Sequence, residues 1–229
     1  MVLTSPENVL GIGLYTPAEA ALYARIALPT LTRWLFGAGG QAVVTSELEG
    51  ERIVTFLDFV QAMAVRSIRI TKKVPLQKIR DAVSLAQDEY QVQYPLAKKH
   101  TVFLLGDDII INVGNEESKR LVQGSGKRRR NLVMKEVAEL YMKDVGFDPD
   151  GLANLYTAYE WSEFVVKMDP RLRFGEPLLP TCGYSAQALW EASIAEGSIA
   201  NAAKVYKVKE GEVETACRYI DLISPKTAA

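Results

Sequence analysis

The sequence predicts a mainly α-helical protein with small β elements, an α+β fold with more than one domain. Helix-start signals and apolar residues at helical spacing recur over 16–91, which indicates several packed helices. A glycine turn at Gly106 between two apolar runs predicts a β-hairpin. Three further helical segments with short breaks fill 185–222. With 229 residues, 48% of them hydrophobic, the chain is long enough to bury two modest cores.

The first predicted element is a helix from Thr16 to about Ala24. Thr16 can cap this helix, and Pro17 suits its first position. Glu19 follows the cap at the spacing of a capping box. A short turn at 25–28 then leads into the next element.

A second short helix is predicted over Pro29–Phe36, and the glycine-rich stretch 37–40 ends it, because glycine tolerates the left-handed conformation past a helix end. Two strands are predicted next, at Val43–Val44 and Arg52–Thr55, around a turn at 48–51. These elements form a compact unit of two helices and a hairpin.

Two longer helices follow, over 56–72 and over 76–91, where Pro75 marks the second start. The hairpin then joins strands at 102–105 and 109–113.

Beyond a turn at Asp148–Gly151, the stretch 169–180 is punctuated by proline and glycine and leads into a last helical unit. Its three helices are predicted over 185–195, 198–206 and 210–222. The sequence therefore predicts an N-terminal domain over 1–97, a β-hairpin and linker region over 98–166, and a C-terminal helical domain over 167–229.

Two short helices joined by a tight turn form a helix-turn-helix, which places its second helix in the major groove of DNA. Ala20 and Ala21 allow close helix approach, and Leu31 and Leu35 would face the core. The arginine of the second helix can bond guanine or phosphate. The predicted DNA-binding residues are Thr16, Pro29, Thr30, Thr32, Arg33 and Arg52. The alternative is a helical hairpin within a core, with Trp34 simply buried.

Several stretches of 12–97 together resemble the MerR-like winged helix-turn-helix family. They are Tyr15-Thr16-x-x-Glu19-Ala20-Ala21, Ile26-x-x-x-Thr30-Leu31-x-Arg33-Trp34-Leu35, Phe56-Leu57-Asp58-Phe59-Val60 and Val74-Pro75-Leu76-x-x-Ile79-Arg80-x-Ala82. The resemblance implies that the hairpin 43–54 is a wing, with Arg52 near the DNA backbone. The chain departs from the family at the turn, where Arg25 and Ala27 replace a glycine and a Ser or Asp cap.

Two basic segments have two interpretations each, a solvated surface or a phosphate contact. The first lies in 66–80 and contains Arg66, Arg69, Lys72, Lys73, Lys78 and Arg80. The second is the run Lys127–Arg130.

The C-terminal residues 169–222 resemble a small bacterial domain that is common in candidate antitoxins. The resemblance rests on Pro170-x-x-x-Phe174-Gly175-x-Pro177, on the start of a helix at Gly197-Ser198-Ile199 and on the three helices. The turn that usually carries Gly-Thr-Arg reads Thr181-Cys182-Gly183-Tyr184. Together with the N-terminal resemblance, this arrangement is similar to the larger VapB-type antitoxins. That similarity implies a PIN-domain ribonuclease toxin as partner and repression of the protein's own operon.

Composition argues against several other classes. The net charge of −1 requires any DNA-binding face to come from clustered charge. Two cysteines, Cys182 and Cys217, fit free thiols in a reducing cytoplasm. His100 is the one histidine and has no ligand-like spacing around it, so no metal, cofactor or catalytic residue is expected and the protein is not expected to be an enzyme. No signal peptide or membrane helix is expected, and we expect a cytoplasmic protein.

The expected partners are double-stranded DNA of its own promoter, a ribonuclease toxin and a second copy of the chain, because one short recognition helix reads few base pairs. Aromatic residues and arginine are enriched at protein interfaces. The predicted toxin-binding residues are Arg171, Phe174, Tyr184 and Trp190. Two alternatives remain, a MerR-like regulator whose C-terminal domain senses a small molecule and an adaptor that binds only protein.

Overall fold

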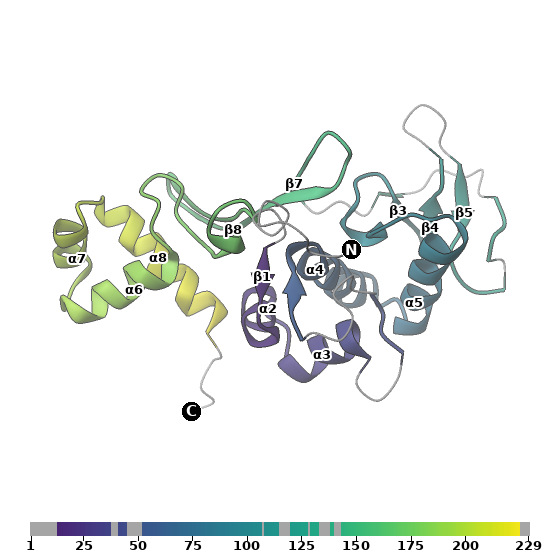
Figure 1. The fold of residues 1–229 in the computed structure, drawn as a ribbon, viewed down its shortest axis with the longest axis horizontal. Coiled ribbons are helices and arrows are strands. Elements are labelled where there is room, and N and C mark those ends of the chain that lie inside the picture. The colour runs from purple at the N-terminus through teal and green to yellow at the C-terminus, as the bar shows by residue number, and fades with distance from the viewer. Residues whose placement is uncertain are drawn as a thin grey trace, which may run out of the picture. The chain divides into compact units, whose positions relative to one another are not determined.

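The computed structural model describes residues 13–37, 41–44, 52–106, 108–114, 120–127, 129–132, 138–139 and 143–224. Its contacts divide the chain into two compact units, unit 1 over Tyr15–Asn154 and unit 2, which contains Leu155–Ala229. The fold is mixed α and β, as predicted (Figure 1). The three-domain division at 97 and 166 stays a prediction.

Unit 1 begins with helices whose ends lie close to their predicted positions. They are α2 (Pro17–Ala24), α3 (Leu28–Phe36), α4 (Phe56–Lys72) and α5 (Leu76–Ser84), the last continued by the π-helical turn η1 (Leu85–Glu89). The predicted capping box of α2 is present, with the Glu19 N–H donating to the Thr16 hydroxyl at 3.2 Å and the Thr16 N–H donating to the Glu19 carboxylate at 2.7 Å. α4 has a second capping box between Thr55 and Asp58 that the sequence analysis did not identify.

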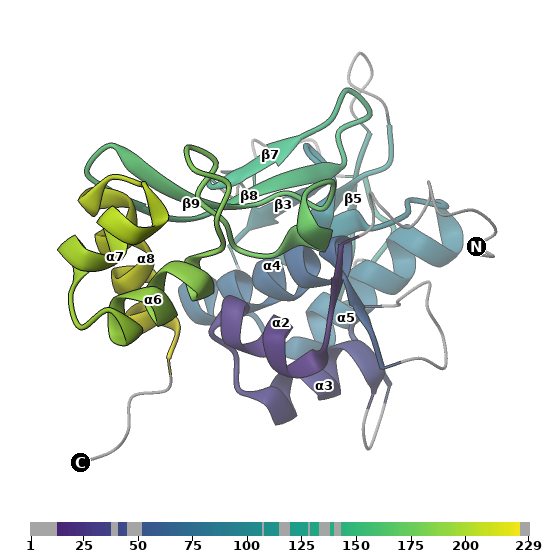
Figure 2. The same cartoon turned by 60° about the vertical axis from the view of Figure 1, so that its left-hand side comes forward.

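These helices share one apolar core. Leu31 of α3 and Phe59 of α4 are completely buried, and the Tyr15 ring packs on Phe59 at 5.7 Å between centroids. Ala20 and Ala24 are also buried, so their small side chains let α2 approach its neighbours. Figure 2 shows α2 and α3 side by side, as their contacts also indicate.

The predicted wing has a different pairing. The strand β2 (Val54–Thr55) pairs with β1 (Leu14–Tyr15), which the sequence analysis did not predict. Val43 and Val44 lie in a bend, and their backbone N–H groups donate to the Trp34 carbonyl at 2.7 and 3.3 Å. The expected strand at 43–44 is therefore wrong, because α3 supplies the acceptor for these N–H groups. The predicted turn at 48–51 lies outside the described residues.

A small antiparallel sheet covers α5. Its order is β5-β4-β3-β6, with β3 (Val102–Leu105), β4 (Asp108–Asn112), β5 (Leu121–Gln123) and β6 (Ala138–Glu139). The predicted hairpin is confirmed as β3 and β4, with Val102 opposite Ile111. Gly124 lies close against α5, since a Cβ there would be 2.7 Å from the Cβ of Ala82. The short turn η2 (Pro95–Ala97) and strand β7 (Val145–Phe147) complete the regular elements of this region.

The strands β8 (Ala153–Trp161) and β9 (Phe164–Met168) form a hairpin where the sequence analysis predicted a linker. The register shifts between Thr157 and Tyr159, which marks a β-bulge. The region 98–166 therefore contains a second hairpin besides the predicted one.

Unit 2 ends in the helices α6 (Ala186–Ala195), α7 (Ile199–Tyr206) and α8 (Glu210–Ile223), at the predicted positions. The side chains of Ser185 and Ser198 cap α6 and α7. α8 packs on α6 and on β9 (Figure 2). Gly211 leaves room for the Phe164 ring. Within the described part of the chain, no helix has both the length and the apolar character needed to cross a membrane.

Candidate nucleic-acid interface

The turn between α2 and α3 is closed by backbone hydrogen bonds. Arg25 ends α2 in the left-handed conformation, with φ +53°, and the Ile26 N–H donates to the Ala21 carbonyl at 2.9 Å. Ala27 precedes α3 and offers no side-chain cap. These two residues replace the glycine and the capping residue that the resemblance led us to expect, yet the turn keeps its tight form.

α3 presents distinct faces. Leu31, Trp34 and Leu35 are buried, whereas Pro29 and Arg33 are exposed. Among the described residues no hydrogen bond or ion pair engages the Arg33 guanidinium, so it is available to an external partner. The structure thus places the predicted arginine on the outward face. Burial of Trp34 matches the alternative interpretation equally well.

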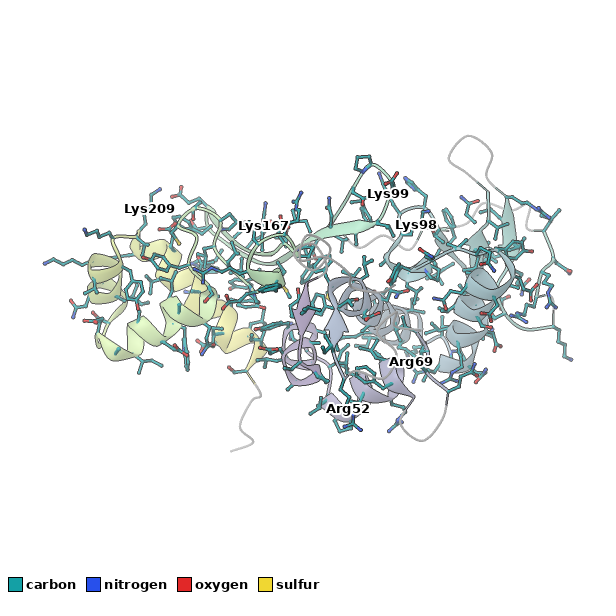
Figure 3. The ribbon with its side chains drawn as sticks, in the orientation of Figure 1. Arg52, Arg69, Lys98, Lys99, Lys167 and Lys209 are labelled. Carbon is teal, nitrogen blue, oxygen red and sulfur yellow. The ribbon has the colours of Figure 1, made fainter. Side chains whose placement is uncertain are left out.

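The other predicted DNA-binding residues differ in availability. The Thr32 hydroxyl donates to the Leu28 carbonyl, and the Thr16 hydroxyl exchanges hydrogen bonds with Glu19 within the cap. Arg52 is exposed. Figure 3 shows Arg52 and Arg69 at the same end of unit 1 as α3 and shows Lys98 and Lys99 away from it. The hydroxyl groups therefore have structural partners, whereas the arginines remain accessible.

A hollow of about 320 Å³ lies beside α3. It is lined by Arg25, Ile26, Thr30, Trp34, Arg66, Arg69 and Ile70. Three of these residues are arginines, and none is acidic. Arg66 and Arg69 belong to the predicted basic segment 66–80, whereas no binding role was predicted for Arg25, because no local pattern connects it with residues 41 positions or more further along the chain.

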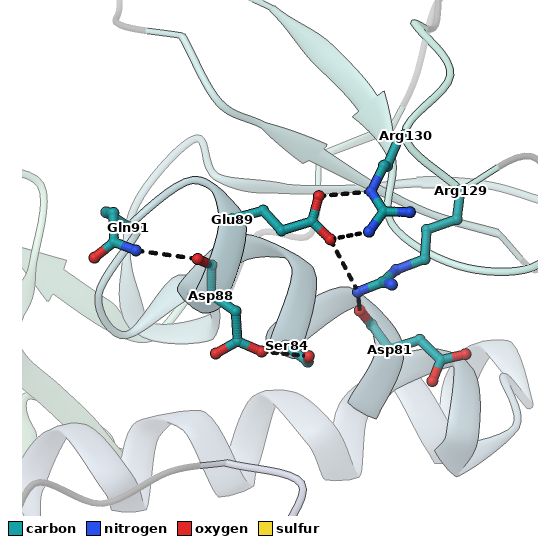
Figure 4. A network of polar contacts seen from close by, with 7 residues as sticks. All are labelled: Asp81, Ser84, Asp88, Glu89, Gln91, Arg129 and Arg130. Carbon is teal, nitrogen blue, oxygen red and sulfur yellow. Dashed lines mark hydrogen bonds and ion pairs between the residues drawn. The ribbon is translucent and has the colours of Figure 1, made fainter.

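Other members of the basic segments bind within the protein. Lys78 forms an ion pair with Asp108 at 3.0 Å, and Arg80 donates to the Ala42 carbonyl at 3.2 Å. Arg129 and Arg130 both approach the Glu89 carboxylate (Figure 4). The phosphate interpretation of Lys127–Arg130 is therefore not supported for these two arginines, because Glu89 already partners them.

The predicted toxin-binding residues lie on different elements of unit 2. Arg171 makes a two-bond ion pair with Asp169, at 2.8 and 2.6 Å, which lowers the pKa of that carboxyl through hydrogen bonding. Phe174 is 45% exposed and has φ +56°, in the turn η3 (Arg173–Gly175). Trp190 is half-buried on α6.

Tyr184 lies in a second hollow, of about 560 Å³, within unit 2. Its ring meets the Tyr206 ring edge-on at 5.2 Å. The carboxylate of Glu212 accepts hydrogen bonds there from the Thr181 hydroxyl and the Lys209 backbone N–H. Burial raises the pKa of the Cys182 thiol in the same hollow, which keeps it protonated and unreactive. Among the described residues, no group of three or more His, Cys, Asp and Glu side chains could hold a metal ion.

No protein-family model matches the chain. A Mycobacterium tuberculosis (strain ATCC 25618 / H37Rv) protein named "Putative antitoxin VapB45" is 24% identical over 199 residues, which are 75% of this chain and 79% of that protein. The crystal structure of Rv2018 from Mycobacterium tuberculosis superimposes with a TM-score of 0.58 at 19% identity, covering 88% of this chain and 96% of the other. The chain thus has a distant relative with an antitoxin name, and it shares the fold of Rv2018.

Proposed function

We propose that this protein is the antitoxin of a type II toxin–antitoxin pair, which represses its own promoter and neutralises a PIN-domain ribonuclease toxin in the cytoplasm. The antitoxin name of the distant relative supports the class. The N-terminal helices would act as a winged helix-turn-helix, and unit 2 would carry the three-helix domain that binds the toxin.

The observation that carries the DNA-binding part is the position of Arg33. Its guanidinium lies exposed on α3 and has no partner among the described residues. A free arginine in this position suits a helix that reads the major groove, because arginine can bond guanine through two hydrogen bonds.

The test is binding of the full chain to a labelled duplex of its own promoter, by fluorescence anisotropy at several salt concentrations. Arg33→Ala should weaken binding by about 1–3 kcal/mol and reduce the preference over a random duplex. Lys99→Ala is the matched control, because Lys99 is exposed away from α3 (Figure 3). Absence of binding at low salt, or indifference to Arg33, would overturn the proposal.

We propose that the protein acts as a homodimer. Two half-sites about one helical turn apart give the specificity that one short helix cannot supply. Light scattering should give twice the 25.3 kDa mass of the chain. A strict monomer at tens of micromolar would contradict this.

For the toxin we propose the surface at Phe174, together with Arg171, Tyr184 and Trp190. Leu172 and Phe174 are both exposed large apolar side chains in one short turn, at 49% and 45%. Such side chains gain most by being covered at an interface.

Point variants test the toxin surface better than a deletion from 169 onward, because that deletion would remove α8 from β9. Phe174→Gly removes the ring at a position where φ is +56° and glycine is unstrained. The variant should fold normally and lose co-purification with the toxin. The control is Val205→Ala, which shortens an exposed apolar side chain of α7. Full toxin affinity in Phe174→Gly would remove Phe174 from the surface.

One observation favours a second candidate function, a regulator that senses a small molecule. The hollow around Tyr184 and Tyr206 combines aromatic residues with polar and charged ones such as Thr181, Lys209 and Glu212, which offers both stacking and hydrogen-bonding partners to a polar small molecule. A thermal-shift screen of metabolites that finds a ligand releasing promoter DNA, in the absence of any toxin partner, would favour this candidate over the antitoxin.

A further inference from the structure

We propose that the hollow lined by Arg25, Arg66 and Arg69 binds a backbone phosphate of double-stranded DNA. The inference rests on the proposed DNA binding and deepens it, since it adds a phosphate contact beside the predicted DNA-binding residues of α3, one of which, Thr30, also lines the hollow. The site joins the left-handed end of α2 to the C-terminal half of α4.

The residues that line the hollow favour an anion. Three arginines are among the residues that line this hollow of about 320 Å³, and none of the described residues that line it is acidic. Arg25 and Arg66 have no ion pair among the described residues, and Arg69 uses one N–H for the Val74 carbonyl at 3.1 Å. Arginine has five donors, and its planar fork matches a phosphate through two parallel hydrogen bonds. Like charges held together without a counter-charge repel one another, and a bound phosphate would remove that repulsion.

The geometry of α3 links the hollow to the predicted recognition face. Thr30 and Trp34 line the hollow and lie one helical turn apart on α3. Successive helix residues are rotated by roughly 100°, so Arg33 lies only about 60° around the helix from Thr30. A phosphate in the hollow would therefore follow the strand whose bases face Arg33. The same DNA could contact both sites without a change in the fold of unit 1.

The backbone at Arg25 supports a role for its side chain. A residue with a φ of +53° is strained unless it is glycine. Glycine would make the same turn without strain, so the arginine at this position costs stability. Arg25 is one of the residues that line the hollow, which provides a reason for a charged residue there.

The experiment compares two duplexes of equal length, the promoter and a random sequence, with the full chain. Arg25→Gly relieves the strained backbone, and Arg66→Gln keeps most of the half-buried side chain while removing its charge. The double variant should lose roughly 5–10-fold in affinity for both duplexes alike, and its slope of log affinity against log salt should fall by about 1. Lys99→Ala should leave affinity and slope unchanged.

The failures of the two proposals are distinguishable. If the wild-type chain binds neither duplex, both the proposed function and the phosphate site are overturned. If the wild-type chain binds and the folded double variant matches it in affinity and slope, only the phosphate site is overturned. Circular dichroism and melting temperature confirm that the variant is folded.

A second readout locates the anion and separates DNA from a free phosphate compound. Trp34 lines the hollow, and the Trp161→Phe/Trp190→Phe background leaves it as the sole tryptophan of the chain. Duplex DNA should change Trp34 emission in that background, and the change should disappear with Arg25→Gly/Arg66→Gln. Inorganic pyrophosphate should cause no saturable change at sub-millimolar concentration. Saturation by pyrophosphate there, with an unaltered DNA salt slope in the double variant, would assign the hollow to a free anion instead.

Discussion

Arg130 and Glu89, 41 positions apart in the sequence, form a two-bond ion pair. Nε of Arg130 donates to Oε2 of the carboxylate at 2.6 Å, and Nη2 donates to Oε1. Hydrogen bonding from Arg130 lowers the pKa of Glu89. Glu89 therefore stays ionised and neutralises part of the basic loop, which also approaches it through Arg129.

This pairing predicts that Arg130→Ala leaves DNA affinity and its salt slope unchanged. Removing a charge that already has a carboxylate partner removes little attraction for phosphate. Glu89→Gln should have the larger effect and increase nonspecific DNA binding, since it frees two guanidinium groups. Fluorescence anisotropy against a random duplex measures both. A large loss of affinity in Arg130→Ala would restore the phosphate interpretation of 127–130.

Asp169 predicts a pH dependence of stability. Its pKa is lowered by the hydrogen bonds from Arg171, so the unfolded chain takes up a proton at a higher pH than the folded chain. The stabilisation is therefore complete above the ordinary carboxyl pKa of 3.8 and is lost as pH falls through the lower folded value. The melting temperature of Asp169→Asn should be lower than that of the wild type at neutral pH, and the difference should shrink below pH 3.8. A constant difference would exclude this carboxyl as its source.

Arg25→Gly should change stability and DNA binding in opposite directions. Glycine adopts the left-handed conformation without strain, which gains about 1–2 kcal/mol, and the greater freedom of glycine in the unfolded chain takes back about half of that. The net gain should be about 0.5–1 kcal/mol in urea unfolding, together with weaker DNA binding. Arg25→Ala keeps the strain and removes the charge, so it should weaken binding without any gain. Equal stabilities of the two variants would contradict the strain argument.

Gly124→Ala should destabilise unit 1 by about 1–3 kcal/mol, because overpacked side chains force the backbone apart. The added Cβ would lie 2.7 Å from the Cβ of Ala82 and 3.1 Å from the Ile109 carbonyl. Ala82→Gly in the same chain should recover part of the loss, and a double-mutant cycle in urea measures that coupling. Additive effects would show that the sheet does not press on α5 at this point.

The helices could be predicted because their signals are local. Thr16 and Glu19 fix the start of α2, and Ser185 and Ser198 mark two later helix starts. Caps act within one helical turn, so the residues that decide a helix end are adjacent in the sequence.

The strand pairings and the hollow could not be predicted in the same way. β2 pairs with β1 although α2 and α3 lie between them in the sequence. In the same way β6 pairs with β3 although β4 and β5 lie between them. No short pattern records such partners, since each strand is only two residues long at β1, β2 and β6. The hairpin of β8 and β9 does have a sequence signal, aromatic and β-branched residues on both sides of Ser162, but it was not predicted. The hollow needs Arg25 and Arg66 in one place, which only the packing of α2 on α4 provides.

The bulge in β8 determines where this strand can gain or lose a residue. Tyr156 pairs with Met168 and Tyr159 pairs with Val166. The extra residue at Ala158 therefore places both tyrosines on the same face of the hairpin as the buried residues Val166 and Met168 of β9. An insertion or deletion elsewhere in β8 would turn every later side chain to the opposite face of the hairpin. Loss of Ala158 alone would preserve these pairs and leave a straighter strand. Length variation among relatives should therefore concentrate at this one position of the strand.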